Sequence, residues 1–476
     1  MATNIWSSRS PSQDKPEIIK ELPTDEPEDV LFDTLYGLRT IELNRPKKLH
    51  SLNGSMIRKI VPRLQEWQKS DMANVVVIKG SGPKAFCAGG DVSALAIDNT
   101  EGAEGQKKST DYFGLEYKLD HLIATYTKPY VAFMDGITMG GGVGLSIHAP
   151  FRIATEKTVF AMPETTIGFF PDVGASFFLP RMPGAVGTWL ALTSEKLKGA
   201  NVFYSGIATH YLHSTSLPAL ESRLAELRFK DYDSLDTRLQ LIDSTIEEFT
   251  TGLPYDEPIL LQGRLRNTID KVFGQTSVPE IISSLEQLAN NEKDAWAKKW
   301  ATETLATIRK RSPTSVYVTL RQMQLGSQWS IAETFQREHQ IAANFMKHND
   351  FTEGVHALLI RKDGKPQWKP ASLDDVKEGD NIADPFFVVE GQERLKLLSE
   401  DDYRSYPHAR FSIPREQDIE AFVKQGEKSH KETINYFVQQ KKGKQGIREI
   451  VTEIVTRKTK GSENGLVWLD TVSAES

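Results

Sequence analysis

The chain has 476 residues, more than one ordinary hydrophobic core supports, so its length predicts two or more domains. Apolar residues make up 39% and charged residues 26%, as in a globular protein, and a net charge of −6 argues against a molecule built as a whole to bind nucleic acid. The single cysteine, Cys87, excludes an internal disulfide and a cysteine-rich zinc site and fits a reducing compartment. No apolar run approaches the roughly 20 residues of a membrane span, so no membrane association is expected.

Residues 1–30 contain seven acidic residues, three basic residues and four prolines, which predicts a flexible acidic tail. Mitochondrial targeting segments are basic and poor in acids, so this segment has the wrong charge for one. The last three residues, 474–476, are not a peroxisomal signal.

The first half of the chain predicts alternating strands and helices, the α/β pattern. Apolar and β-branched runs predict strands at 35–43, 75–78 and 130–134, and helical periodicity predicts helices at 55–69, 110–125 and 140–147. Pro62 falls inside the first helix, where it is tolerated only near the first turn or as a kink.

Beyond about residue 235 the strand signals largely stop and the chain becomes mainly helical. Helices are expected at 235–249, 259–273, 281–288, 293–309 and 331–348, and then at 416–425, 431–438 and 447–455. The segment 441–460 carries seven basic and two acidic residues. It predicts either a solvated helix packed on the body of the protein or a surface for an anionic partner such as RNA.

The stretch 136–172 carries the strongest chemical signal. A glycine cluster at 136–144 exposes backbone N–H groups, and two carboxylates, Glu164 and Asp172, follow in a segment broken by prolines and a glycine. Amides that stabilise an anion beside paired carboxylates are suited to hydrolysis of an acyl compound.

The glycine cluster does not match three other glycine-containing motifs. The dinucleotide fingerprint needs a third glycine where the chain has Leu145 or Ile147, depending on the register, and a phosphate loop needs a Gly-Lys-Ser/Thr that is absent. A hydrolase nucleophile elbow around Ser146 has His148 in place of the second glycine. We therefore expect Ser146 to be a helix residue and His148 to be structural or on the surface.

Several segments together carry a specific family resemblance: 84–91, 128–132, 136–146, 160–164, 170–174, 197–208 and 350–355. On these motifs, over about residues 30–375, the chain resembles the 3-hydroxyisobutyryl-CoA hydrolase family of the crotonase (enoyl-CoA hydratase/isomerase) superfamily. The resemblance implies an α/β crotonase fold, a spiral of β-β-α units followed by a mainly helical region. The expected division is a tail at 1–30, a catalytic core at 31–235, a helical region over the active site at 236–375 and an unmatched C-terminal extension with a basic end at 376–476.

The resemblance also implies a site and a reaction, the conversion of 3-hydroxyisobutyryl-CoA and water to 3-hydroxyisobutyrate and CoA in valine breakdown. The backbone N–H groups of Gly90 and Gly141 would form the oxyanion hole, and Glu164 would be the catalytic base or the nucleophile. Asp172 would be the second catalytic residue and contact the 3-hydroxyl, and Glu116, with Gly141, Glu164 and Asp172, would bind the substrate. Neither a metal nor a cofactor is expected beyond the CoA of the substrate.

The hydratases carry a further catalytic glutamate two residues after the glycine triplet, where this chain has Gly144, and this disfavours hydratase activity. Cys87 is expected to pack in the interior. Arg361 and Lys362 either reach CoA phosphates or lie in a solvated loop.

The resemblance implies a location in the mitochondrial matrix, and the sequence assigns no oligomeric state. Fungal members of this family also occur as constituents of the mitochondrial small ribosomal subunit. The alternative function is therefore a structural role there, with or without retained activity, and the extension and its basic end are compatible with it.

Overall fold

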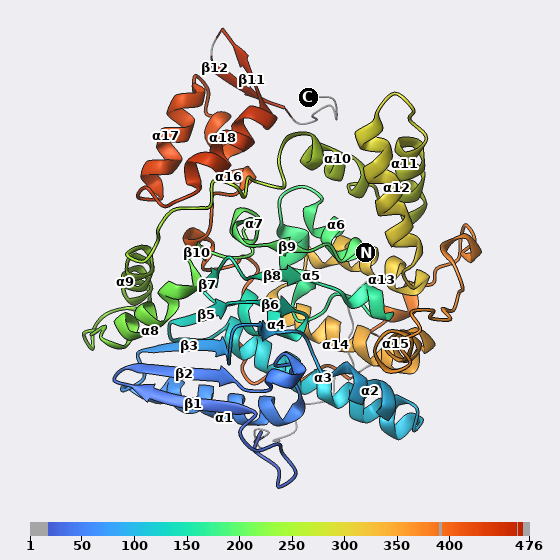
Figure 1. Ribbon diagram of the computed structural model, residues 1–476, viewed down its shortest axis with the longest axis horizontal. Helices are drawn as coiled ribbons and strands as arrows, with labels where there is room; N and C mark the ends of the chain where they lie inside the picture. The colour runs from blue at the N-terminus through green and yellow to red at the C-terminus, as the bar shows by residue number, and fades with distance from the viewer. Residues whose placement is uncertain (1–17, 390–392, 464, 470–476) are drawn as a thin grey trace.

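The computed structural model describes residues 18–389, 393–463 and 465–469, and within these the α/β core is built on two sheets (Figure 1). The six-stranded sheet has the order β1-β2-β3-β5-β7-β10, and the four-stranded sheet has the order β4-β6-β8-β9. The strands of the first sheet are β1 Val30–Leu35, β2 Leu38–Leu43, β3 Val75–Gly80, β5 Tyr130–Met134, β7 Phe151–Ala154 and β10 His210–Tyr211. Those of the second are β4 Ala85–Cys87, β6 Ile137–Met139, β8 Val159–Ala161 and β9 Leu197–Lys198.

From β3 to β8 consecutive strands alternate between the two sheets, and this builds the β-β-α spiral. β3, β5 and β7 pair in parallel in one sheet, while β4, β6 and β8 pair in parallel in the other. Helices return the chain after each strand pair: α2 Val92–Asn99 and α3 Ala103–Ala124 follow β4, and α4 Gly141–Ile147 follows β6. The expected α/β crotonase spiral is confirmed.

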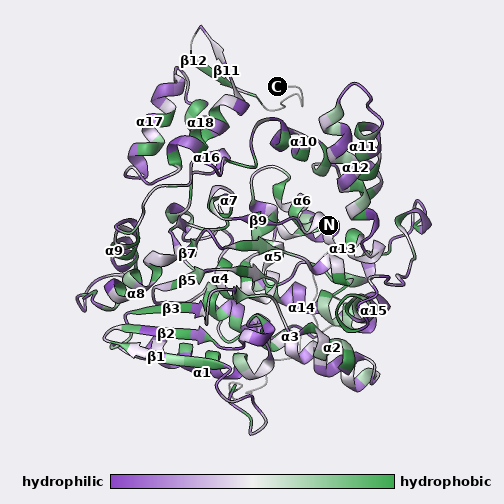
Figure 2. Ribbon diagram, in the orientation of Figure 1, coloured by the Kyte–Doolittle hydropathy of each residue, from purple (hydrophilic) through white to green (hydrophobic). Residues whose placement is uncertain are grey.

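The six-stranded sheet is covered on both faces because its side chains alternate in direction. Val76 and Ile78 of β3 pack with α1 Gly54–Lys69 and α3, whereas Val75 and Val77 pack with α8 Leu217–Ala225 and α9 Leu235–Glu247. Green strands at the centre of Figure 2 follow this burial.

Helices dominate the chain from α9 onward, as the periodicity predicts. They are α10 Gly263–Phe273, α11 Val278–Ala289, α12 Ala295–Arg309, α13 Pro313–Gly326, α14 Ile331–Lys347 and α15 Asn349–Val355, and three shorter helices, α5 Ala175–Phe178, α6 Val186–Thr193 and α7 Ala200–Tyr204, precede them. α13 was not predicted. α14 packs along α3 and brings the helical region against the core.

The C-terminal extension forms a small unit with a core of its own, seen in red in Figure 1. It contains α16 Glu416–Val423, α17 His430–Gln440, α18 Ile447–Lys458 and a hairpin of β11 Thr459–Ser462 and β12 Gly465–Trp468. The hairpin was not predicted. α18 buries the apolar face expected of it, including Ile447, Val451 and Val455.

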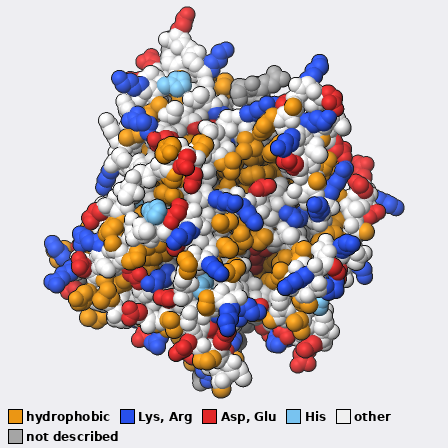
Figure 3. Space-filling model, viewed as in Figure 1, with side chains coloured by type: hydrophobic (Ala, Val, Ile, Leu, Met, Phe, Trp, Pro, Cys, Tyr) orange, Lys and Arg blue, Asp and Glu red, His pale blue; other side chains and the backbone are white. Residues whose placement is uncertain are grey.

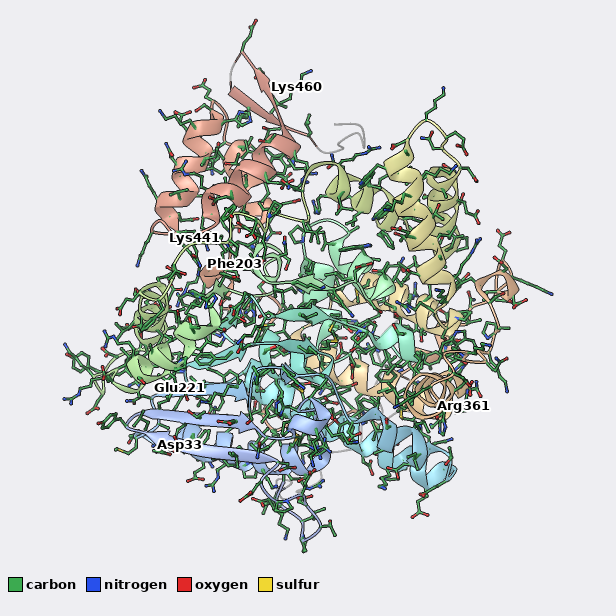
Figure 4. The ribbon with its side chains drawn as sticks, in the orientation of Figure 1. Asp33, Phe203, Glu221, Arg361, Lys441 and Lys460 are labelled. Carbon is green, nitrogen blue, oxygen red and sulfur yellow. The ribbon has the colours of Figure 1, made fainter. Side chains whose placement is uncertain are left out.

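Part of the basic end of the extension turns inward. Lys444 reaches the core, Arg457 is paired with Glu453 and Glu416, and the Lys441 Nζ donates to the carbonyl of Ser412 at 2.7 Å. Figure 4 shows Lys441 near the junction with the core and Lys460 further out by the hairpin.

The prediction of a flexible tail at residues 1–30 is wrong for residues 18–29. Residues 18–29 pack on the core: Ile19 and Asp29 are buried, Asp29 pairs with Lys59 at 2.5 Å, and Arg58 binds Asp25 through two nitrogens. Acidic residues expected to stay in solvent instead meet basic residues of α1. Residues 1–17 lie outside the described part of the chain. No helix among the described residues has the length and apolarity to cross a membrane.

Candidate active site

The backbone N–H groups of two glycines lie close together at the start of α4. Gly90 follows β4 and bridges to Leu52, and Gly141 begins α4 after Gly140, whose φ of 45° and ψ of −119° favour glycine. A Cβ placed on Gly141 would lie 3.5 Å from the Gly90 nitrogen, so the two residues are neighbours. Within the described residues neither N–H has a protein acceptor, as required of a pair that binds an oxyanion.

Three carboxyl groups converge on these glycines. A Cβ on Gly140 would lie 3.1 Å from Glu164 Oε1, and a Cβ on Gly141 would lie 2.7 Å from Glu116 Oε1. Glu164 opens a short 3-10 helix after Pro163, and Glu116 projects from α3. Asp172 accepts a hydrogen bond of 2.7 Å from the hydroxyl of Tyr117, the residue beside Glu116. The structure therefore brings together all five residues expected in the site.

The three carboxyl groups are almost fully buried, with exposed fractions of 2% for Glu116, 5% for Glu164 and 4% for Asp172. Burial raises the pKa of Glu164 and of Glu116 well above the ordinary range, and the charge of Asp172 adds to the rise in both. Burial also raises the pKa of Asp172, to about 7, although the Tyr117 hydroxyl favours its ionised form. All three carboxyl groups therefore lie in surroundings that oppose their negative charge.

Apolar walls account for this burial. Phe169 stacks on Phe113 with ring centroids 5.1 Å apart, and Phe170 stacks on Phe345 at 5.6 Å. Phe169 and Phe170 lie in the same segment as Asp172, with only Pro171 between, so this segment brings both the carboxyl group and apolar rings to the site. Glu164 Oε2 has no hydrogen-bond partner among the described residues, and it is available to a ligand or a water.

Two further buried acidic residues, Glu338 and Asp120, lie near the site and were not predicted. Glu338 of α14 accepts from the amides of Gly174 and Ser176 at 2.7 and 2.9 Å, which fixes the turn after Asp172. Burial, with the charge of Asp172, raises its pKa to about 8. No sequence signal links Glu338 to a residue more than 160 positions earlier. Asp120 lies four residues after Glu116 on α3, a spacing that shares a helix face and could have revealed it.

The Asp120 carboxyl group lies beside Gly144, the position at which the hydratases carry a glutamate. A Cβ on Gly144 would lie 2.7 and 2.8 Å from the two Asp120 oxygens, so this carboxyl group fills the space that a side chain at position 144 would need. Asp120 is fully buried, and neither oxygen has a hydrogen-bond partner in the described chain. Burial and then Glu116 raise its pKa well above the ordinary range. A carboxyl group therefore lies beside position 144 although residue 144 provides none.

The residues expected to be structural lie as expected. The Ser146 hydroxyl donates to the Gly142 carbonyl within α4 at 2.8 Å, and His148 is buried with its Nε2 2.9 Å from the Val173 carbonyl. Burial lowers the pKa of His148 to about 4 and raises that of Cys87 to about 12. Neither residue is suited to be a nucleophile or its partner at neutral pH.

Arg361 lies at the edge of the helical region beside α15 and is paired with Glu353 and Asp363 at 2.9 and 3.0 Å (Figure 4). This arrangement corresponds to the solvated loop that was one of its two expected roles.

One group of three described side chains, His210, Asp243 and Glu247, has the spacing of metal ligands. The sequence did not reveal it because His210 is far along the chain from the other two. Lys444 of the extension lies among them, with its Nζ 2.9 Å from His210 Nε2, 3.7 Å from Asp243 Oδ1 and 3.3 Å from Glu247 Oε1. The ammonium group supplies the positive charge that this group of side chains requires.

The two-sheet spiral and the paired glycine amides beside buried carboxyl groups define a crotonase-type protein. The family model described as enoyl-CoA hydratase/isomerase matches residues 38–387, and the chain belongs to that family. Two solved structures, a carnitinyl-CoA dehydratase from Mycobacterium thermoresistibile and an enoyl-CoA hydratase from Rhodobacter sphaeroides, align with TM-scores of 0.65 at 31% and 30% identity. They cover 79% and 78% of this chain and 100% of their own chains.

Curated relatives fall into two kinds. "Small ribosomal subunit protein mS47" of Neurospora crassa is 60% identical over 94% of this chain and 89% of its own length. "3-hydroxyisobutyryl-CoA hydrolase, mitochondrial" is 44% identical in Gallus gallus, over 79% of this chain and 92% of its own length. The protein of that name in Homo sapiens is 43% identical over 75% and 88%. The family resemblance is confirmed, and the relatives support the expected mitochondrial location.

Proposed function

We propose that this protein hydrolyses the thioester of 3-hydroxyisobutyryl-CoA. The observation that carries the proposal is the pair of amides at Gly90 and Gly141, which have no acceptor among the described residues, beside the buried carboxyl groups of Glu164 and Asp172. The hydrolase relatives, at 43–44% identity, support the choice of substrate.

In the proposed reaction the thioester carbonyl oxygen accepts hydrogen bonds from both amides. As water attacks the carbonyl carbon, that oxygen gains negative charge, and each preorganised donor stabilises it by roughly 3–4 kcal/mol. The tetrahedral intermediate then collapses, the C–S bond breaks, and the sulfur leaves as the CoA thiolate and takes up a proton.

Glu164 is the residue that activates water or attacks the carbonyl itself. Its raised pKa makes the ionised form a strong base, and its free Oε2 points to no other partner in the described chain. A direct attack would form an anhydride that water then opens, and both routes remain part of the proposal. Asp172, held by Tyr117, orients the 3-hydroxyl, and Glu116 lines the same pocket.

The test follows CoA release from 3-hydroxyisobutyryl-CoA with a thiol reagent, to which the buried Cys87 contributes no signal in the folded protein. Glu164→Gln and Asp172→Asn should each lower kcat by at least about 100-fold. Glu292→Gln is the matched control, because the Glu292 side chain is 80% exposed and far outside the site. Equal turnover by the wild type and the Glu164 variant would end the enzymatic proposal.

A second function is favoured by the extension. A match over 94% of the chain must include most of residues 376–476, whereas the hydrolase relatives cover 75–79% of the chain. We therefore also propose that the protein is a constituent of the mitochondrial small ribosomal subunit. On the face drawn in Figure 3, basic and acidic side chains are interspersed, so a protein surface is as well suited to this face as RNA.

The test is sedimentation of the full chain, tagged and expressed in its own mitochondria, on a sucrose gradient. Migration with the small subunit after a high-salt wash supports membership, and migration only as free protein contradicts it. The Glu164→Gln variant should migrate like the wild type, because loss of chemistry leaves the surface unchanged.

A further inference from the structure

A groove of about 1010 Å³ lies beside the candidate active site. Its lining comes from residues 18–22 near the N-terminus, the start of α1, the helices α2 and α3, His339 of α14 and residues 393–396 of the extension. A cavity of this size is at the upper end of the range for small-molecule sites. A second groove, of about 1190 Å³, lies between α18 and residues 252–263, and its lining includes none of the buried carboxyl groups.

Two residues of the first groove's lining lie next to Gly90, one of the two oxyanion glycines. Asp91 and Tyr112 are part of its lining, and Asp91 directly follows Gly90. The Tyr112 hydroxyl donates to the Leu52 carbonyl at 3.1 Å and would lie 3.3 Å from a Cβ on Gly90. A ligand in the groove that contacts Tyr112 therefore lies close to Gly90.

Basic residues outnumber acidic residues in the described lining of the groove by six to four. The basic residues are Lys20, Arg58, Lys108, Lys118, Arg394 and Lys396, and the acidic residues are Asp91, Asp98, Asp111 and Glu393. Lys108 pairs with Asp98 at 2.7 Å and Arg58 pairs with Asp25, so these two cations are compensated. Asp91 pairs with Arg45 at 3.0 Å and Asp111 with Lys107 at 2.5 Å, and both of these basic partners lie outside the lining.

The extension is fixed where it enters the groove. Gln336 and Gln340 of α14 donate to the carbonyls of Leu395 and Phe386, each at 3.2 Å. The Leu395 side chain packs over Gly114 of α3, where a Cβ would lie 3.3 Å from its Cδ1. Gly114 thus leaves room for the extension on α3, and the adjacent residues Arg394 and Lys396 are both exposed.

We propose that Arg394 and Lys396 of the C-terminal extension bind the phosphate groups of the CoA moiety. This inference rests on the proposed hydrolase function. The pyrophosphate and the 3′-phosphate of CoA need cationic donors, and guanidinium and ammonium groups are the side chains that supply them. The pantetheine arm then runs along the groove to Tyr112 and carries the thioester to Gly90 and Gly141. Neither Arg361 nor Lys362 belongs to the described lining, so the phosphate contacts come from the extension rather than from that loop.

The test uses CoA alone, so that binding is measured without turnover. Titration calorimetry on the full chain should give a Kd for CoA that is about tenfold higher in the double variant Arg394→Gln/Lys396→Gln. The KM for the CoA ester should rise by the same factor. The KM for the pantetheine ester of the same acid, which has no phosphate, should change less than about twofold. Lys431→Gln/Lys442→Gln, two exposed lysines of the extension away from this groove, is the matched control and should leave every value unchanged.

Each other outcome has a defined meaning. An unchanged Kd for CoA in the groove variant, or no CoA binding by the wild type, overturns the inference. If both esters lose affinity equally, the charge-conserving pair Arg394→Lys/Lys396→Arg decides: recovery of CoA binding supports the phosphate contact, and no recovery overturns it. If CoA binds with this dependence but no ester is hydrolysed, the inference stands and the proposed hydrolase function fails.

Discussion

Replacing Asp172 with asparagine should stabilise the protein at neutral pH while it abolishes turnover. The Asp172 carboxyl is 4% exposed, and burial raises its pKa from the ordinary 3.8 to about 7. Between these two values the unfolded chain has released the proton and the folded chain still holds it. The unfolded state therefore binds fewer protons, and stability falls as the pH rises through this window.

The magnitude follows from the size of the rise in pKa. Roughly 3 pKa units at about 1.4 kcal/mol each correspond to a cost on the order of 4 kcal/mol at pH 7 and above, and to almost none near pH 4. Asparagine has nearly the same shape, never ionises, and keeps an oxygen that accepts from Tyr117. The Asp172→Asn variant should thus gain up to about 4 kcal/mol over the wild type at pH 8 and nothing at pH 4.

Urea unfolding followed by tryptophan fluorescence, at pH values from 4 to 8, measures this difference. Asp256→Asn provides the control, since Asp256 is exposed and does not belong to the site. A stability difference between wild type and Asp172→Asn that does not grow with pH, or one that favours the wild type at pH 8, would refute the reasoning. It would mean that Asp172 is not held in an environment that opposes its charge.

Three further predictions concern packing and the extension. Gly142→Ala should destabilise the fold by about 3 kcal/mol, because the alanine Cβ would lie 2.2 Å from the backbone carbonyl oxygen of Cys87. A thermal melt measures this loss, and an unchanged melting temperature would contradict the close approach. Cys87 should react with a disulfide reagent only in denaturant, since burial raises its pKa to about 12, and fast labelling of the folded protein would exclude that burial. Lys444→Met should cost about 2 kcal/mol in urea, less in acid once Asp243 and Glu247, whose pKa values lie below the ordinary range, take up protons, and should make the extension sensitive to proteolysis. Lys442→Met is the exposed control, and equal resistance of both variants would show that Lys444 does not anchor the extension.

The sequence predicted the long periodic elements well, because an amphipathic face repeats often enough to be recognised. The helix expected at 331–348 is α14, Ile331–Lys347, and the strand expected at 130–134 is β5 with the same limits. Strands of two or three residues, such as β10 and β4, are too short to show a period. α13 was missed although Ser312 and Pro313 are a typical helix start, with the Ser312 hydroxyl accepting from the Ser315 amide at 3.0 Å.

Pro62 was expected near a first turn or at a kink, and it lies in the middle of α1, Gly54–Lys69, rather than in its first turn, with buried residues on both sides. Packing of that helix on the sheet outweighs the missing hydrogen bond at a single proline. The helix therefore continues through Pro62 because of tertiary packing, which local helix propensity does not reveal.

The site itself was predictable where a motif encodes it locally, as at Glu164 and at Gly141. Its supporting residues were not, because they reach the site through packing. Glu338 fixes the turn after Asp172 from a distant helix, and Asp120 occupies the space beside Gly144. The missing glutamate at position 144 was taken as evidence against hydratase activity, and the buried Asp120 carboxyl group beside that position weakens that inference.

The extension and the active site share one helix. On α14, Gln336 and Gln340 are four residues apart and hold the extension, while Glu338, between them, faces the other way and holds the turn after Asp172. A force that displaces Phe386 or Leu395 therefore acts on the same helix that positions the catalytic turn. The two proposed functions do not use independent parts of the molecule: a ribosomal contact through the extension would act on the groove through Arg394 and Lys396 and on Asp172 through α14.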